Sequence, residues 1–126
     1  MLKPIQDAVE RIAKTLYDKK AEDIVAIYIA DRTVIADYFI VCSGRNNILT
    51  KALADEVEER LEDVLPLRRK EGYNEGRWIV LDYADILVHI FHPEERAYYN
   101  VERLWKDDSN LIDYTEKLNE EEREDS

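Results

Sequence analysis

A chain of 126 residues with 45% apolar residues fits one compact domain with a core of ordinary size. No apolar run reaches the length of a membrane span, and the start MLKPIQDAVERIAK carries charges where a signal peptide would be apolar, so we expect a soluble, cytoplasmic protein. The net charge of −11 argues against direct binding of bare nucleic acid, because phosphate contacts need clustered Lys and Arg, but it is compatible with a basic protein partner.

The first half of the chain alternates helical and strand patterns. Apolar residues recur every three or four positions from about residue 4 to 19, which predicts a helix with one apolar stripe. The runs IVAIYIA and YFIVCS, at 24–30 and 38–43, are rich in β-branched and aromatic residues and predict two strands. SGRNN then supplies an Asn suited to cap a second amphipathic helix over 49–64, which Pro66 follows closely.

The second half predicts a hairpin and one more helix. LRRKEG is a short polar strand or connector, and EGYNEG has two glycines suited to a turn. WIVLDY and ILVHIFH predict a hairpin that bends around Ala84 and Asp85, and a last helix starts after Pro93 and runs to about Lys106. We therefore predict a single α/β domain over 1–108, with a mixed β-sheet flanked by helices. Residues 107–126 carry nine acidic and two basic side chains, and we expect 109–126 to be a flexible, solvated acidic tail.

Both histidines fall in the stretch WIVLDYADILVHIFHPEERAYYN, residues 78–100. If 86–92 form a strand, its side-chain period of two sends His89 and His92 to opposite faces, so the two cannot share a metal. No further cluster of metal ligands stands nearby in the sequence. We expect no metal site, and we interpret His89 as a structural or interface histidine with one satisfied hydrogen bond.

The residues give no support for catalysis or for a cofactor. Asp82 and Asp85 are spaced as Asp-x-x-Asp across the predicted bend, which does not place both on one face as Asp-x-Asp would, so we expect them to shape the turn. Ser43 precedes a helix, but neither Gly-x-Ser-x-Gly nor a phosphate-loop pattern occurs. The single cysteine, Cys42, has no partner for a disulfide or a Cys-x-x-Cys motif and is expected to be a small buried side chain.

Six large aromatic side chains fall within 28 residues, more than the interior of a small domain easily holds. Trp, Tyr and Arg dominate interface energetics and typically cost about 2 kcal/mol or more when truncated at a hot spot. We expect Phe91 and Trp105 in the core, whereas core and surface positions remain equally open for Trp78 and Tyr99. The composition favours a binding module over an enzyme without naming its partner.

Two blocks of the chain resemble the bacterial ribosomal silencing factor, or Iojap-like, family. They are ADYFIVCSG followed by KALADEVEERL, and EGRWIVLDYADILVHIFHPEERAYYNVERLW, and the likeness extends from about Lys19 to Trp105. The second block is far longer than a chance motif. One position departs from the family pattern: Ala84 stands where the family usually has glycine. If the backbone there has a positive φ, alanine lowers the stability of the fold by about 1 kcal/mol relative to glycine. The acidic segment beyond Asp108 lies outside the recognisable pattern.

The resemblance implies a fold related to the nucleotidyltransferases but without their catalytic carboxylates. It also implies a factor that binds the large ribosomal subunit, on the ribosomal protein numbered fourteen, and blocks joining of the small subunit so that translation is repressed. Some members form homodimers. Two alternatives remain open, a nucleotidyltransferase-like nucleotide-binding enzyme and a homodimeric adaptor module.

The positions that match the family motif supply the residues expected to bind the partner. The aromatic rings are expected to act as anchors, and the aspartates are expected to face cationic groups. They are Trp78, Asp82, Tyr83, Asp85, His89, Arg96, Tyr98 and Tyr99. We expect no catalytic residue, no sequence-specific contact with nucleic acid and no membrane contact.

Overall fold

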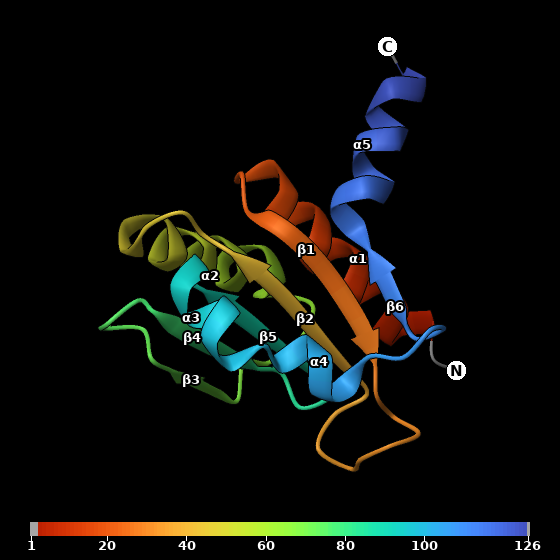
Figure 1. The fold of residues 1–126 in the computed structure, drawn as a ribbon, viewed down its shortest axis with the longest axis horizontal. Coiled ribbons are helices and arrows are strands. Elements are labelled where there is room, and N and C mark those ends of the chain that lie inside the picture. The colour runs from red at the N-terminus through yellow and green to blue at the C-terminus, as the bar shows by residue number, and fades with distance from the viewer. Residues whose placement is uncertain (1–2, 126) are drawn as a thin grey trace.

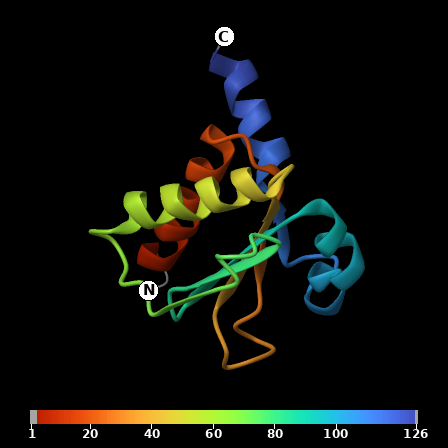
Figure 2. The ribbon, with the colours of Figure 1, turned by 90° about the vertical axis from the view of Figure 1, so that its left-hand side faces the viewer.

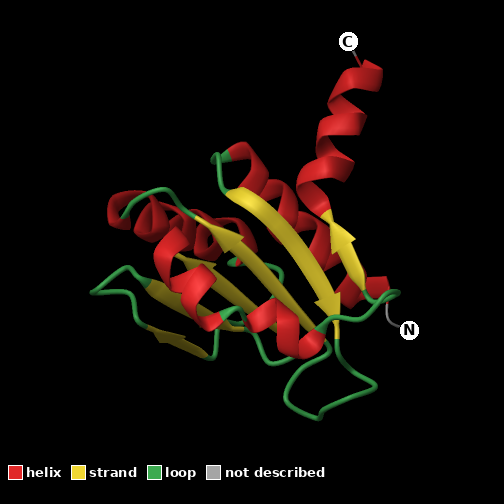
Figure 3. Ribbon diagram, in the orientation of Figure 1, coloured by secondary structure: helices red, strands yellow, loops and turns green. Residues whose placement is uncertain are grey.

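Residues 3–125, which the computed structural model describes, form one six-stranded mixed sheet with helices on both faces (Figures 1 and 3). The strand order is β3-β4-β5-β2-β1-β6, and within these residues β2 and β5 pair in parallel while the other neighbours pair antiparallel. The strands are β1 Glu22–Tyr28, β2 Tyr38–Ser43, β3 Arg69–Glu71, β4 Trp78–Asp82, β5 Ile86–Phe91 and β6 Leu111–Asp113. The helices are α1 Lys3–Asp18, α2 Asn47–Leu61, α3 Pro93–Tyr99, α4 Val101–Trp105 and α5 Tyr114–Asp125. The predicted α/β architecture is confirmed.

The helices divide the sheet into two different faces. α1 and α2 lie side by side against one face, here called the inner face, whereas α3 and α4 cross the opposite, outer face (Figure 2). Ile79, Leu81 and Val88 belong to the inner core, and Phe39 and Phe91 belong to a smaller outer core. Because side chains alternate along a strand, Trp78, Val80 and Asp82 share the outer face of β4.

Helices α1 and α2 form where their sequence patterns predict. The apolar stripe of α1 is almost completely buried, and Ile12 and Leu16 each contribute about 1.5–3 kcal/mol by leaving water. The backbone N–H of Leu49 donates to the Asn46 side chain over 2.8 Å, so Asn46 is the N-cap of α2. None of the helices within residues 3–125 has the length and apolar character that crossing a membrane requires.

The hairpin of β4 and β5 closes through a strained turn. Trp78 pairs with Phe91 and Asp82 pairs with Leu87, so the predicted bend around Ala84 and Asp85 is confirmed. Ala84 has φ 73°, a left-handed conformation that favours glycine. The N–H of Ala84 donates to the carboxylate of Asp82 over 2.8 Å, which holds the turn in place.

The last predicted helix is in fact two helices. The pattern predicted one helix that starts after Pro93 and runs to about Lys106, but the structure ends α3 at Tyr99 and begins α4 at Val101. Asn100 between them has φ 47°, and its N–H still donates to the carbonyl of Arg96 over 2.8 Å. Asn tolerates the left-handed conformation better than most residues, so one residue redirects the chain without changing the apolar spacing.

The C-terminal segment also differs from the flexible acidic tail expected over 109–126. β6 pairs antiparallel with β1, and α5 follows and projects beyond the sheet (Figure 1). Tyr114 and Leu118 are buried in the inner core, and the N–H of Ile24 in β1 donates to the Thr115 hydroxyl over 2.8 Å. Two apolar anchors four residues apart therefore attach an otherwise charged helix, a pattern too sparse to stand out in the sequence.

Candidate partner-binding surface

The structure divides the eight residues predicted for partner binding between the two faces of the sheet. Trp78 and Asp82 lie on the outer face, and Tyr98 and Tyr99 are exposed at the end of α3 above it. Tyr83 is only 3% exposed and packs in the inner core. A partner docked on the outer face therefore cannot reach the Tyr83 ring, whose pKa burial raises to about 12.

Three rings form a continuous aromatic patch, defined here as Trp78, Tyr98 and Tyr99. The Trp78 ring stacks on buried Phe91 at 4.9 Å between centroids and contacts the Tyr99 ring at 4.8 Å. Tyr98 meets Tyr99 edge to face at 4.9 Å, and the two tyrosines are 81% and 47% exposed. Because Trp78 is held by its ring contact with buried Phe91, and Tyr99 by its ring contact with Trp78, these two side chains have little conformational entropy left to lose. The patch is an ordered, partly exposed aromatic surface.

His89 supports the patch from below. The indole N–H of Trp78 donates to Nδ1 of His89 over 3.1 Å, and because this nitrogen accepts, the proton of the neutral imidazole is on Nε2. Nε2 is buried without a hydrogen-bond partner among the described residues. Burial lowers the pKa of His89 to about 4, so the ring is neutral at physiological pH. This confirms the interpretation of His89 as a histidine with one satisfied hydrogen bond.

Arg96 is held by its own chain. Its guanidinium donates twice to the carboxylate of Glu102, at 3.2 and 2.8 Å, and once to the Ser43 hydroxyl at 3.0 Å. The Arg96 side chain is 12% exposed. These bonds join α3, α4 and the end of β2, so Arg96 orients the helix that carries the two tyrosines.

Two of the residues considered for chemistry, Asp82 and Cys42, have structural roles. Asp82 accepts the turn hydrogen bond from Ala84, and Asp85 is exposed in the same turn. Cys42 is fully buried in β2, which raises the pKa of its thiol to about 12 and leaves it unreactive. Within residues 3–125 no group of three His, Cys, Asp or Glu side chains is arranged to hold a metal ion.

A cavity of about 190 Å³ on the outer face was not predicted; we call it the outer slot. Val80 and Leu87 form its floor, and Ile35, from the loop between β1 and β2, forms one wall. Arg69, Glu71 and Asp82 complete the lining. The apolar pair VI inside the polar joint DRTVIAD was the one indication in the sequence, because apolar residues at a loop tip are unusual.

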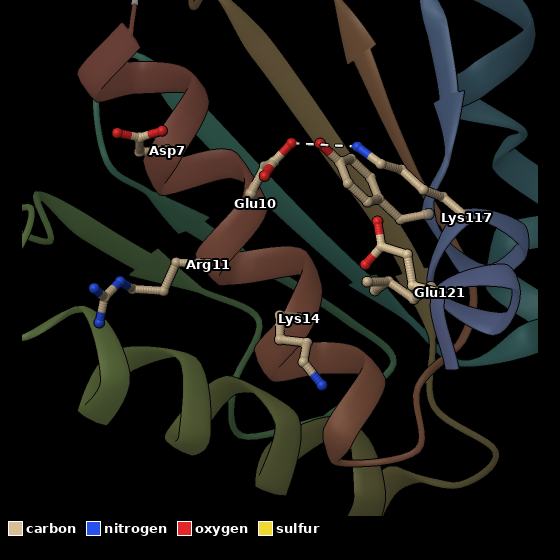
Figure 4. Close-up of a pocket in the computed structure, with 8 residues that line it drawn as sticks. Asp7, Glu10, Arg11, Lys14, Lys117 and Glu121 are labelled. Carbon is tan, nitrogen blue, oxygen red and sulfur yellow. Dashed lines mark hydrogen bonds and ion pairs between the residues drawn. The ribbon is translucent and has the colours of Figure 1, made fainter. Parts of the chain in front are cut away.

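A second hollow separates α1 from α5 and has a volume of about 400 Å³ (Figure 4). Lys117 of α5 reaches the Glu10 carboxylate of α1 at 3.3 Å, whereas Arg11 points away from α5. The lining holds three basic and three acidic side chains, so it offers no net charge to a ligand. The basic residues are Arg11, Lys14 and Lys117, and the acidic residues are Asp7, Glu10 and Glu121.

Residues 3–126 match the family model described as "Ribosomal silencing factor during starvation". The chain belongs to the ribosomal silencing factor family. It is 41% identical to the ribosomal silencing factor of Bacillus subtilis over 91 residues, covering 71% of this chain and 77% of that one. It is 39% identical to the ribosomal silencing factor of Halalkalibacterium halodurans over 103 residues, covering 81% of this chain and 88% of that one.

The fold of this silencing factor is shared with a crystal structure of a protein from Chromobacterium violaceum. The two superpose with a TM-score of 0.78 at 31% identity, over 84% of this chain and 91% of that one. The family match includes β6 and α5, which lie beyond the blocks that carried the resemblance. The family is named for regulation rather than for a reaction, and the chain is a regulatory factor of translation, not an enzyme.

Proposed function

We propose that this silencing factor binds the large ribosomal subunit and prevents the small subunit from joining it. The observation that carries the proposal is the aromatic patch, in which Tyr98 is 81% exposed and Tyr99, whose ring contacts the Trp78 indole, is 47% exposed. Solvent-exposed rings on a rigid base are typical of binding hot spots. Membership of the ribosomal silencing factor family directs this surface toward the ribosome.

The partner we propose on the large subunit is the ribosomal protein numbered fourteen, which the family resemblance indicates. A basic ribosomal protein complements a chain of net charge −11, and complementary fields increase the rate of encounter. The surrounding RNA phosphates repel the same chain, so docking is confined to the protein surface. The factor acts where ribosomes assemble, in the cytoplasm.

The proposed mechanism is occlusion and needs no bond to be made or broken. A domain of 126 residues on the joining face of the large subunit excludes the small subunit by its volume. The fraction of blocked subunits follows the fraction occupied, so a concentration about ten times the Kd blocks about nine-tenths of them.

Sedimentation of purified ribosomal subunits tests the proposal. Excess factor should shift material from joined ribosomes to free subunits. A Tyr98→Ala, Tyr99→Ala double variant should bind about thirtyfold more weakly, equivalent to about 2 kcal/mol. Ile48→Ala is the matched control, because it removes an exposed apolar side chain from α2. Subunits that join equally well with and without excess wild-type factor would exclude the proposal.

A homodimeric adaptor is the second candidate, because the same exposed rings could meet a second copy of the chain. Light scattering distinguishes the two functions. If the patch serves a dimer alone, Tyr99→Ala reduces the mass of the wild-type particle and leaves subunit joining unaffected. If the patch serves the ribosome, the variant loses subunit binding whatever its mass.

A further inference from the structure

The outer slot continues the surface of the aromatic patch along β4. Trp78, Val80 and Asp82 follow one another on the same face, so the patch and the far end of the slot are about 13 Å apart. A protein interface of ordinary size covers both. Ile35, in the wall of the slot, is 57% exposed and therefore accessible to a docking partner.

The charges in the slot do not balance. Arg69, which pairs with Glu71 at 3.2 Å and lies opposite Asp82 in the sheet, is one cation against two carboxylates in the lining. Asp82 uses Oδ1 to accept the Ala84 N–H, and its other oxygen has no partner among residues 3–125. Asp82 therefore leaves one net negative charge at the end of an apolar floor.

We propose that the outer slot receives a lysine or arginine side chain from the protein that docks on the aromatic patch. This inference rests on the proposed function and names one contact within it. The alkyl stem of such a side chain packs along Val80, Leu87 and Ile35, and its charged head reaches Asp82. The free carboxylate oxygen gains a charge-assisted hydrogen bond, which is stronger than a neutral one.

Two other occupants fit the slot less well. An apolar side chain would fill the floor but would bury the free oxygen of the Asp82 carboxylate without a partner, which is unfavourable. An RNA phosphate would face the carboxylates of Asp82 and Glu71 with only Arg69 to offset them.

Binding of variants to purified large ribosomal subunits tests the slot. Asp82→Asn keeps an oxygen for the Ala84 N–H and removes the charge, and we expect a Kd at least about tenfold higher. Ile35→Ser removes the wall, and we expect a Kd about fivefold higher. Thermal unfolding should show both variants folded. The matched controls are Glu62→Gln, an exposed charge at the end of α2, and Val34→Ser, a fully exposed neighbour outside the slot; both should bind as wild type.

The outcomes separate the slot from the proposed function. If wild type does not bind the large subunit, the proposed function fails. If wild type binds and loss of Tyr98 and Tyr99 weakens it, but Asp82→Asn and Ile35→Ser bind normally, the slot alone is wrong. Tighter binding by Asp82→Asn would indicate an RNA phosphate, and an effect of Ile35→Ser alone would indicate an apolar side chain; either overturns the proposal. Carbodiimide coupling then identifies the cation, because it links Asp82 to a lysine but not to an arginine.

Discussion

Ala84 occupies a backbone conformation that an L-residue with a Cβ adopts at a cost. Its φ of 73° lies in the left-handed region, where glycine is favoured by about 1 kcal/mol. The Asp82 carboxylate accepts the Ala84 N–H and holds the turn in this conformation. The cost expected for alanine at this position depended on a positive φ, and Ala84 has one.

Ala84→Gly should therefore raise the free energy of unfolding by about 1 kcal/mol, measured by urea denaturation. Ala97→Gly is the control, because Ala97 is exposed within α3, where glycine should lower stability by about 0.5–1 kcal/mol. A loss of stability of similar size in both variants would show that the turn does not store this strain.

His89 makes stability depend on pH. Burial lowers its pKa from 6.5 to about 4 in the folded protein, so the unfolded chain takes up a proton at a higher pH than the folded one. The free energy of unfolding should fall as pH decreases from about 6.5 to about 4, by up to about 3 kcal/mol. Denaturation of wild type and His89→Phe at each pH measures this contribution. If the difference between the two proteins stays constant across this range, His89 is not the cause.

At the level of elements, α5 is attached by few contacts, and these can be weakened singly. Leu118 is 9% exposed and packs in the inner core, whereas Glu120 on the same helix is exposed. Leu118→Ala should lower the free energy of unfolding by about 2–3 kcal/mol, and Glu120→Ala should change it by less than about 0.5 kcal/mol. Urea denaturation measures both. Equal stability of the two variants would support the solvated tail that the composition suggested.

Strands and helices whose conformation follows from their own local sequence were predicted well. YFIVCS corresponds residue for residue to β2, because all six side chains are buried and the run is uniformly apolar or small. The helix α2 has both a cap at Asn46 and a regular stripe. In contrast, β6 has three residues and owes its conformation to hydrogen bonds with β1, which lies more than eighty residues earlier. The break at Asn100 depends on one backbone angle that no apolar spacing records.

The partner-binding surface was predicted only in part. The alternation of side chains along a strand shows which residues share a face of the sheet, but it does not show which face is covered by a helix from a distant part of the chain. Trp78 and Tyr99 were left equally open between core and surface, and the structure makes Trp78 half-buried and Tyr99 about half exposed. Tyr83 was grouped with them by its place in the motif, but its side chain points to the inner face of the sheet and packs in the inner core. The outer slot combines a loop and three strands, so no local pattern contains it.

For the whole molecule, net charge should govern how fast the factor finds its partner. If the partner is the basic ribosomal protein proposed above, this chain of net charge −11 should associate about tenfold more slowly when monovalent salt rises from about 0.05 to 0.5 M. Stopped-flow association with purified large subunits measures this rate. The Tyr98→Ala variant should show the same salt dependence with faster dissociation, since the ring acts after contact. An association rate that rises with salt would mean that repulsion by RNA dominates the encounter.

The parallel pairing of β2 with β5 affects the order in which the protein folds during synthesis. β1 with β2, and β4 with β5, are neighbours along the chain that can pair early, but Tyr38 must find Ile86 across the whole of α2 and β3. Contacts between residues so far apart form slowly, because a long loop must close before any attraction compensates for it. During synthesis β2 therefore stays without its partner β5, and the centre of the sheet cannot form until translation has passed Phe91.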